Sequence, residues 1–307
     1  MINEMSVVPS GIGCETIAAV LVAYHPDSGV EERLMAAARQ VHKLLIVDNT
    51  PVQHRLYDFE RMAERIPNAR VLPNGDNIGL GAAYNLGFHE AARYGYRWVL
   101  TLDQDTLLQE DFGDVIRRRL TDAQYRDSRA RPIGVIGANF VNSATPVLQT
   151  SASAGLREVD AVISSGSITS VDCWRSIGGY RADFFIDYVD IEFCLRASEC
   201  GYGVVLVTDV LMIHGMGHTS ENALFGVYRR MSSNYPPFRH YFIMRNFVAT
   251  AREHGRSNLG WLVAELGRRA RFTLLSLLME DGRLSMAKAT LKGLADGLRG
   301  RMGPIRS

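Results

Sequence analysis

The amino-acid sequence predicts an α/β fold in which helices cover both faces of a parallel sheet. Two strand-like runs, 17–23 and 44–47, lie on either side of a helical pattern at 31–41, and a short third run follows at 70–72. Branched apolar runs separated by helical spacing are typical of repeated β-α-β units. Such units place parallel strands side by side and leave the crossover helices on the two faces of the sheet.

The later elements continue this alternation until the pattern becomes purely helical. Apolar residues recur at helical spacing over 80–91, with Asn77 as a cap, and lead to a strand at 98–102. The sequence then predicts an arginine-rich helix and loop at 117–131, a strand at 133–138, a helix at 189–200, strands at 204–207 and 210–213, and helices at 238–254, 259–279 and 284–298. We therefore expect a main domain over 1–236 and a helical tail over 237–307.

The composition is that of a globular protein from a reducing compartment. With 47% hydrophobic and 22% charged residues among 307, the chain can form one large α/β domain with an appendage, and it is unlike a disordered tail. The four cysteines show no Cys-x-x-Cys spacing, and the amino terminus lacks a basic segment followed by an apolar core. We therefore expect no disulfide framework, no secretion signal and a cytoplasmic location.

Basic residues are concentrated in the last quarter of the chain. Residues 239–307 hold 13 Lys and Arg against 5 Asp and Glu, a net charge of +8, which leaves −7 for residues 1–238. The apolar stretch 259–279 is interrupted by Glu265, Arg268, Arg269 and Arg271, so it is too charged to span a bilayer. A basic, amphipathic tail favours an anionic partner such as a membrane surface. Alternatively, its apolar stripe packs on the main domain or on a second subunit.

Two carboxylates follow the strand at 98–102. Asp103 and Asp105, separated by Gln104, come directly after this buried run. In α/β sheets the carboxyl ends of the strands form the edge at which ligands bind. Hard oxygen ligands at this edge suit Mg²⁺ or Mn²⁺ carrying a diphosphate. Because two acids after a strand are more often only a solvated turn or a helix cap, the interpretation depends on the neighbouring motifs.

Two other turns bring polar groups toward the same edge. Asp48 ends the second strand and opens an Asp-Asn-x-Pro turn, which is commonly structural. Its carboxylate is also suited to accept hydrogen bonds from a nucleobase or ribose. Asn77 and Gly79, followed by Asn85, resemble a glycine-eased approach of the backbone to a ligand at a helix start.

Three acids interrupt the hydrophobic run before and within the helix at 189–200. Asp190 and Glu192 are two residues apart and therefore point about 200° away from each other on a helix. Glu192 precedes Arg196 by one helical turn, which favours a structural ion pair. Asp190 is the better candidate for a general base, although the helix dipole alone also favours an acid there. Asp187 is the third acid.

His214 ends the strand at 210–213, and His218 follows four residues later. This spacing also occurs in zinc sites, but Gly215 and Gly217 argue against the helix that such a site needs. We therefore expect His214 to complete the coordination of a cation held by Asp105. The alternative is a satisfied, partly buried histidine.

Taken in order, these motifs resemble the inverting family 2 glycosyltransferases of the GT-A fold, and within them the rhamnosyltransferases. The resemblance runs through most of the chain and rests on the turn at Asp48, Asn77-x-Gly79 with Asn85, Asp103-Gln104-Asp105, Ser165-Gly166-Ser167, Asp190 with Leu195-Arg196, His214, and Arg239-x-Tyr241-x-x-x-Arg245-Asn246. It implies a Rossmann-like mixed sheet flanked by helices, with a nucleotide-sugar half at about 15–110, an acceptor half at about 111–236 and a carboxy-terminal helical extension.

The resemblance also implies a role for each matched residue. Asp48 would hold the pyrimidine, Asn77, Gly79 and Asn85 would line the nucleotide pocket, Asp103 and Gln104 would contact the donor, Asp105 and His214 would bind the metal, Arg245 would meet the diphosphate, and Asp190 would be the base. One position departs from the family pattern. Many members have Glu immediately before the catalytic Asp, whereas this chain has Val189 there, so Asp187 stays an alternative base.

The implied activity is the transfer of L-rhamnose from dTDP-L-rhamnose to a hydroxyl of a lipid-linked or glycolipid acceptor, with Mg²⁺ or Mn²⁺ as cofactor. Alternatives are the same fold moving another sugar, or a non-catalytic carbohydrate-binding relative. The basic tail would contact the inner face of the cytoplasmic membrane peripherally. No nucleic-acid partner is expected, and a homo-oligomer is left open.

Overall fold

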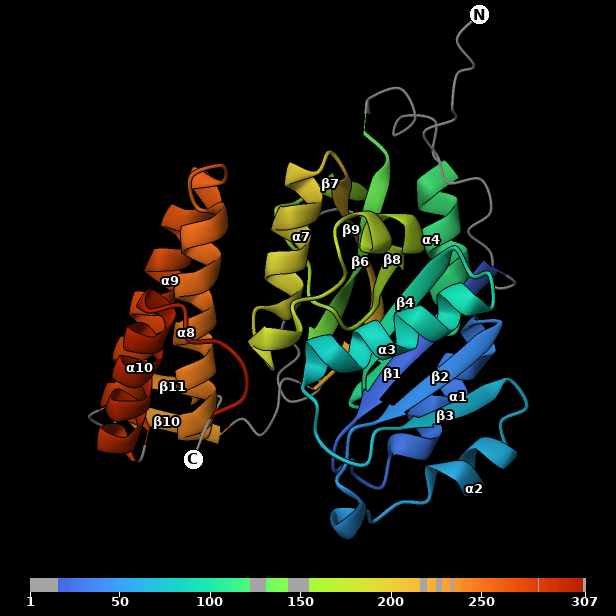
Figure 1. Ribbon diagram of the computed structural model, residues 1–307, viewed down its shortest axis with the longest axis horizontal. Helices are drawn as coiled ribbons and strands as arrows, with labels where there is room; N and C mark the ends of the chain where they lie inside the picture. Colours follow the sequence, from blue (N-terminus) through green and yellow to red (C-terminus); the bar gives the residue numbers. More distant parts are fainter. Residues whose placement is uncertain are drawn as a thin grey trace, which may run out of the picture.

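The chain is built on a nine-stranded mixed sheet with helices on both faces (Figure 1). The computed structural model describes residues 16–121, 131–142, 155–215, 220–224, 228–232, 235–280 and 282–305. A mixed sheet flanked by helices is what the resemblance to GT-A enzymes predicts, and this prediction is confirmed.

Four parallel strands form the half of the sheet that the sequence predicted. They are β1 (Ile17–Ala23), β2 (Lys43–Asp48), β3 (Ala69–Pro73) and β4 (Trp98–Asp103), in the order β3-β2-β1-β4. In β1, Leu21 belongs to the core beneath α1 (Val30–Gln40), and Val20 to the core beneath α3 (Leu80–Arg93). Because both faces are covered, the strands are continuously apolar, and their carboxyl ends meet at one edge. The short η2 (Val52–His54) and α2 (Phe59–Glu64) connect β2 to β3.

The other half of the sheet contains antiparallel pairs. From β4 the order continues through β8 (Ser167–Ser170), β6 (Ile133–Asn142), β9 (Gly203–His214) and β5 (Thr106–Leu108), and β7 (Leu156–Glu158) pairs with β9. The strands predicted at 204–207 and 210–213 are one strand, because the register shifts around Asn139 without a break in β9. The predicted arginine-rich helix is α4 (Phe112–Thr121), and residues 122–130 of that segment lie outside the described residues.

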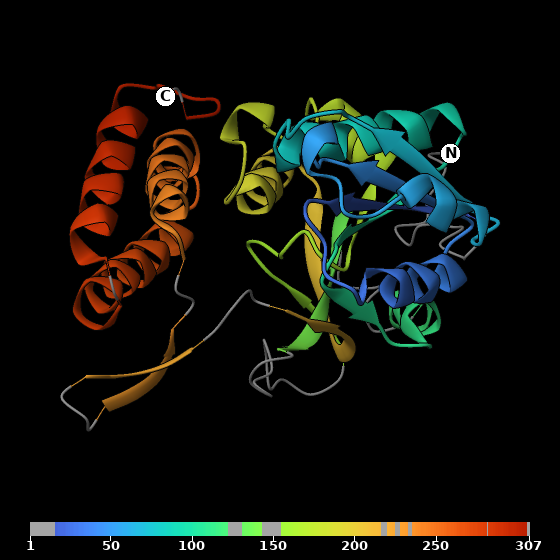
Figure 2. The same ribbon diagram turned by 90° about the horizontal axis from the view of Figure 1, so that it is seen from below.

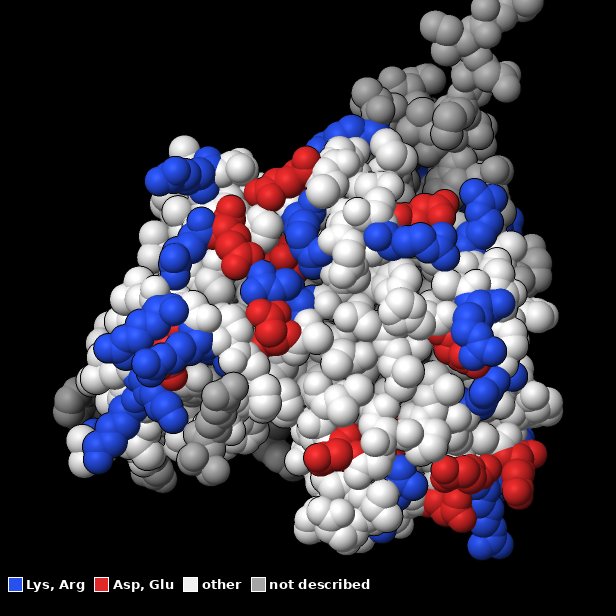
Figure 3. All heavy atoms as spheres, viewed as in Figure 1, with Lys and Arg blue, Asp and Glu red and all other residues white. Residues whose placement is uncertain are grey.

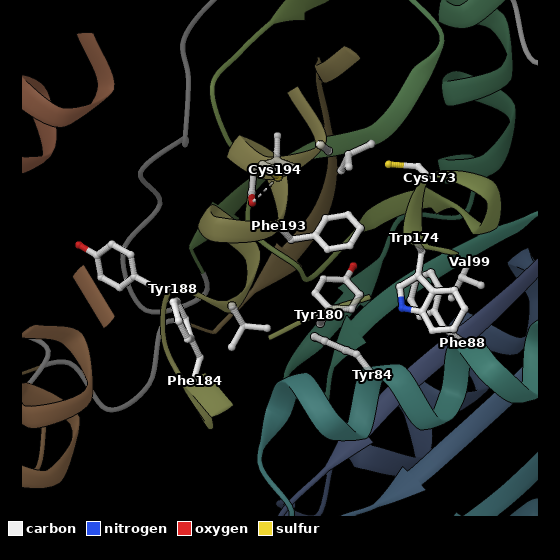
Figure 4. Packing of buried hydrophobic residues seen from close by; sticks show 14 of the residues in the cluster. Tyr84, Phe88, Val99, Cys173, Trp174, Tyr180, Phe184, Tyr188, Phe193 and Cys194 are labelled. Atoms are coloured by element: carbon white, nitrogen blue, oxygen red, sulfur yellow. Dashed lines mark hydrogen bonds between the residues drawn. The ribbon is translucent and has the colours of Figure 1, made fainter. Parts of the chain in front are cut away.

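Stacked rings fill the space between the sheet and the helices that follow β8. These helices are α6 (Val171–Ser176), η3 (Ala182–Phe184) and α7 (Val189–Glu199). Phe88 stacks on Trp174 at a centroid distance of 5.3 Å, and Tyr180 stacks on Phe193 at 4.2 Å (Figure 4). This cluster fixes α3 against the loop that leads into α7.

A hairpin precedes the three helices of the tail. The hairpin pairs β10 (Ser220–Leu224) with β11 (Tyr228–Ser232), and Figure 2 shows it extending away from the rest of the chain. The helices α8 (Pro237–His254), α9 (Leu259–Met279) and α10 (Arg283–Leu298) agree with the predicted ones within one residue at each end. They lie together on the α7 side of the main domain (Figure 1). Among the described residues, no helix has the length and apolar character needed to cross a membrane.

Close contact between α8 and α10 depends on two glycines. A Cβ on Gly293 would lie 2.3 Å from the Tyr241 carbonyl oxygen, and a Cβ on Gly297 would lie 2.8 Å from that of Arg245. Only glycine fits at these two positions, so the backbones of the two helices are in direct contact.

Candidate active site

A cavity of about 950 Å³ opens at the carboxyl edge of β1, β2 and β4. Its first wall is this sheet edge, and its second wall comes from α8, α9 and the segment after α10. The segment 185–191, which leads into α7, lines the cavity as well and contacts both walls. The volume suits a ligand larger than a single sugar.

Asp103, Asp105 and His214 form a cluster on the first wall. Because Thr106 pairs with His214 across β5 and β9, the imidazole is brought beside both carboxylates. Its Nδ1 lies 3.4 Å from Asp105 Oδ1, and its Nε2 lies 4.0 Å from Asp103 Oδ2. Each of the three side chains offers a ligand atom within 4.8 Å of the other two. The structure thus brings together the residues that the sequence predicted around a cation.

The electrostatics of this cluster fit a divalent cation. Burial raises the pKa of Asp105 to about 6, and the nearby charge of Asp103 adds to the effect, while His214 opposes it. When the pKa of one carboxyl group is raised by a second carboxylate nearby, a cation that binds between the two stabilises the ionised form. Carboxylate oxygens and an imidazole nitrogen are ligands that Mn²⁺ accepts, and Mg²⁺ favours the oxygens.

Asp190 faces the same cavity from the first turn of α7. Its Oδ2 accepts a hydrogen bond from the Ser164 N–H (3.0 Å), and its Oδ1 accepts one from the Ile191 N–H (2.8 Å). Burial raises the pKa of Asp190 to about 6 against these backbone donors, and the charge of Asp103 raises it further. A carboxylate with this pKa is ionised at neutral pH and is basic enough to accept a proton.

The other two acids of this segment are engaged elsewhere. Glu192 forms the predicted ion pair with Arg196, with two hydrogen bonds of 2.7 and 2.9 Å, and it is fully buried. Asp187, the alternative base, is paired with Arg239 of α8. Of the three acids, Asp190 is therefore the one whose carboxylate faces the cavity without a cationic side-chain partner among the described residues.

Asn77, Gly79 and Gln104 line the first wall. Asn77 Oδ1 accepts hydrogen bonds from the Gly79 N–H and from Asn49 Nδ2, both at 3.0 Å. Gly79 has a φ of +83°, and a Cβ there would lie 2.8 Å from the Phe185 carbonyl oxygen, so this position requires glycine. Gln104 binds the Tyr24 backbone through both ends of its amide, which ties β4 to β1.

The structure places Asp48 and Asn85 outside the cavity lining. Asp48 is 1% exposed and lies outside the cavity lining, because its carboxylate turns inward to Arg55 (2.8 Å) and to the Thr50 N–H. The next residue, Asn49, lines the cavity instead. Asn85 is bound to the Tyr180 backbone and to Trp174 Nε1, so it fixes the loop after α6.

Arg245 also differs from its expected place at a diphosphate. It is fully buried and outside the cavity lining, and its guanidinium donates to the carbonyl oxygens of Asp183, Phe184 and Gly303. The adjacent Asn246 donates to the carbonyl oxygens of Phe184, Ile186 and Asp187. Together they hold a segment in which Phe185, Asp187 and Tyr188 all have positive φ. Arg245 and Asn246 therefore support the segment that presents Asp190.

Sequence reasoning missed the residues on the second wall. Arg239, Glu265, Arg269 and Phe272 all line the cavity from the tail. The signal for Arg239 was present, because it opens the motif that ends at Arg245 and Asn246. Glu265 and Arg269 carried only the weaker signal of charges in an apolar helix. Which face of that helix meets the main domain is decided by tertiary contacts.

Comparisons with known proteins agree with this architecture, although no protein-family model matches the chain. The chain is 25% identical over 304 residues to the dTDP-rhamnosyl transferase RfbF of Shigella flexneri, covering 94% of this chain and 97% of that protein. It is 30% identical over 177 residues to the uncharacterized protein Rv1525 of Mycobacterium tuberculosis, covering 54% of this chain and 64% of that one.

Solved structures share the fold at low sequence identity. TarS 1–349 of S. aureus in complex with UDP-GlcNAc gives a TM-score of 0.65 at 14% identity, covering 92% of this chain and 81% of that one. GalNAc-T7 with UDP, GalNAc and Mn²⁺ gives 0.55 at 12% identity, covering 77% and 48%. The chain therefore has the GT-A fold of these structures, and its near full-length similarity to RfbF supports a glycosyltransferase.

Proposed function

We propose that the chain is a metal-dependent inverting glycosyltransferase that moves L-rhamnose from dTDP-L-rhamnose to a hydroxyl of a lipid-linked glycan or glycolipid. One observation carries this proposal. Asp103 and Asp105, which cluster with His214, line the same cavity as Asp190. Burial raises the pKa of Asp190 to about 6. The choice of rhamnose is supported by the similarity to the dTDP-rhamnosyl transferase along 97% of its length.

The sheet edge would bind the nucleotide end of the donor. Asn49 and Asn77 offer amide groups to the base and ribose, Gln104 holds the Tyr24 backbone beside them, and Gly79 lets the backbone approach. Asp103 and Asp105, with His214, would hold Mg²⁺ or Mn²⁺. When bound there, the ion supplies positive charge beside the departing diphosphate. Arg245 takes no part in this proposal, because its guanidinium is used within the protein.

Asp190 would act as the general base. The acceptor hydroxyl oxygen attacks the anomeric carbon on the face opposite the diphosphate, and its proton passes to an Oδ of Asp190. The new C–O bond forms as the bond to the diphosphate oxygen breaks, and dTDP leaves with the bonding electrons. A single displacement inverts the anomeric configuration and needs no covalent sugar on the protein.

We further propose that the tail rests on an anionic membrane surface, where lipid-linked acceptors reside. Figure 3 shows Lys and Arg gathered over the helical tail. An exposed apolar stripe runs along α9 at helical spacing, and a second one lies on α10. The exposed apolar residues are Leu259, Val263, Leu266, Leu274 and Leu278 of α9, and Leu284, Leu291, Leu294 and Leu298 of α10.

The donor is tested by thermal stabilisation with a panel of nucleotide sugars. A donor at 100 times its dissociation constant adds about 2.7 kcal/mol of stability, so dTDP-L-rhamnose should raise the melting temperature more than UDP- or GDP-sugars. A stronger response to another nucleotide sugar would reassign the donor. The absence of any response, with no hydrolysis of dTDP-rhamnose, would favour a non-catalytic carbohydrate-binding relative.

Asp105→Asn tests the metal. It keeps the shape of the side chain and removes its negative charge, so transfer should collapse while the melting temperature of the metal-free protein stays the same or rises. Parent and variant are compared at saturating Mg²⁺ and at saturating Mn²⁺. Near-normal turnover of the variant would show that this carboxylate binds no catalytic metal.

A further inference from the structure

The second wall of the cavity combines aromatic rings with matched charges. Arg239 pairs with Asp187, and Arg269 Nε lies 2.9 Å from Glu265 Oε1. Glu265 is 2% exposed although it lines the cavity, and it also accepts a hydrogen bond from the Tyr188 hydroxyl. A buried carboxylate held in this way is part of a built site, because an unpaired charge could not remain there.

Each of these guanidinium groups lies over an aromatic ring. The Arg239 guanidinium carbon is 4.1 Å from the centroid of Tyr235, and that of Arg269 is 5.3 Å from the centroid of Phe272. Figure 4 shows Tyr188 pointing away from the stacked rings of the main domain and toward the tail. The wall therefore combines aromatic rings with both hydrogen-bond donors and acceptors.

This chemistry points to a neutral ligand that is both polar and rich in C–H groups. A site for a phosphate would leave guanidinium groups free, whereas the two that line this cavity already bind carboxylates, Arg239 that of Asp187 and Arg269 that of Glu265, which Arg268 shares. A pyranose has C–H faces that pack on aromatic rings, and its hydroxyl groups both donate to carboxylates and accept from guanidinium groups.

The segment from Asp187 to Asp190 connects the second wall to the proposed base. Asp187 and Tyr188 contact the tail, and Asp190 two residues later contacts Ser164 on the main domain. A sugar held by the tail would therefore approach Asp190 from the side opposite the Asp103 cluster.

We propose that Tyr188, Arg239, Glu265, Arg269 and Phe272 form the acceptor subsite, and that this subsite takes a neutral pyranose. The inference rests on the proposed glycosyl transfer and specifies the acceptor end of that same site. The sugar ring packs against Phe272, and its hydroxyl groups bind the Glu265–Arg269 pair.

The test uses two variants of the second wall, Phe272→Ala and Glu265→Gln, with Tyr94→Ala as control because Tyr94 is an exposed aromatic residue outside the cavity. Acceptors are p-nitrophenyl glycosides of neutral hexoses and N-acetylhexosamines, and the 6-phosphates of the same glycosides. Donor binding is followed by thermal shift with dTDP, and donor use by hydrolysis of dTDP-rhamnose without acceptor.

Both wall variants should raise the acceptor KM about tenfold, which is the effect of losing one good contact of about 1.4 kcal/mol. The dTDP affinity and donor hydrolysis should stay within about twofold of the parent, since they depend on the first wall. Neutral glycosides should be used at least tenfold more efficiently than their 6-phosphates. Phe272→Ala keeps the test decisive if Glu265→Gln unfolds, as thermal melts would show.

Three results would count against the proposal in different ways. Acceptor KM values unchanged in a folded Phe272→Ala, with normal donor hydrolysis, would overturn the subsite alone. A preference for the 6-phosphates would overturn the neutral class of acceptor. A parent protein that neither binds dTDP nor hydrolyses a nucleotide sugar would overturn the proposed function itself.

Discussion

Asp190 is bound by backbone N–H groups and Asp187 by Arg239, and this difference predicts different effects of replacing each residue. Asp190→Asn removes the proposed base, which should cost about 10²–10⁴-fold in kcat with little change in donor binding. Asp187→Asn leaves Arg239 unpaired and should act mainly through the acceptor KM, with a milder loss of kcat. Single-turnover rates and dTDP affinity separate the two. If Asp187→Asn were the inactive variant and Asp190→Asn stayed active, the roles would be exchanged.

The raised pKa of Asp190 also predicts a dependence of stability on pH. The folded pKa of about 6 lies above the reference value of 3.8, so ionising Asp190 costs folding free energy as the pH rises between these values. Asp190→Asn removes this cost, while its loss of one backbone hydrogen bond lowers stability similarly at both pH values. Relative to the parent, the variant should therefore gain about 2 kcal/mol in unfolding free energy between pH 4 and pH 7.

Urea unfolding in the presence of EDTA measures this gain at both pH values. Glu110→Gln, an exposed substitution outside the cavity, serves as control and should show no such gain. A constant difference between Asp190→Asn and the parent across this range would show that the carboxylate is not desolvated in solution.

Arg245→Lys distinguishes the observed position of Arg245 from the expected one. Lysine keeps the charge but cannot donate to several carbonyl oxygens at once. The structure predicts a loss of unfolding free energy of about 1–3 kcal/mol with unchanged affinity for dTDP at permissive temperature. A stable variant with weakened dTDP binding would instead place Arg245 at the diphosphate.

Sequence reasoning located the acids of the site better than its other side chains. Asp103 ends a strand, Asp105 lies in the turn directly after it and Asp190 is in the first turn of a helix, so the direction of each element placed them at the sheet edge. Asp48 also ends a strand, but its side chain turns inward to Arg55, seven residues along in a loop that no periodicity describes. Strand position alone therefore does not decide whether a carboxylate meets the ligand or the neighbouring turn.

At the scale of elements, the sequence predicted those with a regular apolar periodicity and missed the short strands of the irregularly paired half of the sheet. The parallel strands and the tail helices were predicted because their apolar residues repeat over long segments. The strands β5, β7 and β8 are three or four residues long and contain polar side chains, so they were missed. Yet β5 is the element that aligns Asp105 with His214.

His254 joins α7 to α8 and predicts a second dependence on pH. Its Nδ1 lies 2.8 Å from Glu199 and its Nε2 3.4 Å from Glu192, while Glu253, Arg196 and Arg181 complete the surrounding charges. Burial lowers the pKa of His254, but the bonds to Glu192 and Glu199 outweigh it and raise the pKa above 6.5. Its stabilisation is thus complete below about pH 6.5 and is lost as the pH rises through the folded pKa.

Melting temperatures of the parent and of His254→Gln should therefore differ most near pH 6 and converge toward pH 9. His89→Gln is a matched control, since His89 is exposed. A difference that widened at high pH would mean that His254 is neutral in the folded protein.

At the scale of the whole molecule, the tail predicts reversible binding to anionic vesicles. Arg269 is unsuitable for this test because it pairs with Glu265 and lines the cavity. Arg271, Lys288 and Lys292 are exposed, and replacing all three with Gln should weaken vesicle binding about 100-fold, since each contributes about 1 kcal/mol. Sedimentation with phosphatidylglycerol vesicles at two salt concentrations measures this loss.

The control is Gln at Arg61, Arg93 and Arg97, which are exposed on the main domain. Neutral vesicles should bind neither parent nor variant. If the parent ignored anionic vesicles and dimerised instead, the stripes on α9 and α10 would belong to a subunit interface.

The contacts of Arg245 and Asn246 across the seam between tail and main domain have a consequence for how such enzymes diversify. Across this seam both side chains bind only backbone carbonyl oxygens, those of Asp183, Phe184, Ile186 and Asp187, which every sequence provides. A segment beginning near Tyr235 could therefore be exchanged between relatives by recombination if the side-chain pairs Asp187–Arg239, Tyr188–Glu265 and Glu192–His254 are kept. A chimera made at this point should inherit its sugar nucleotide from one parent and its acceptor from the other.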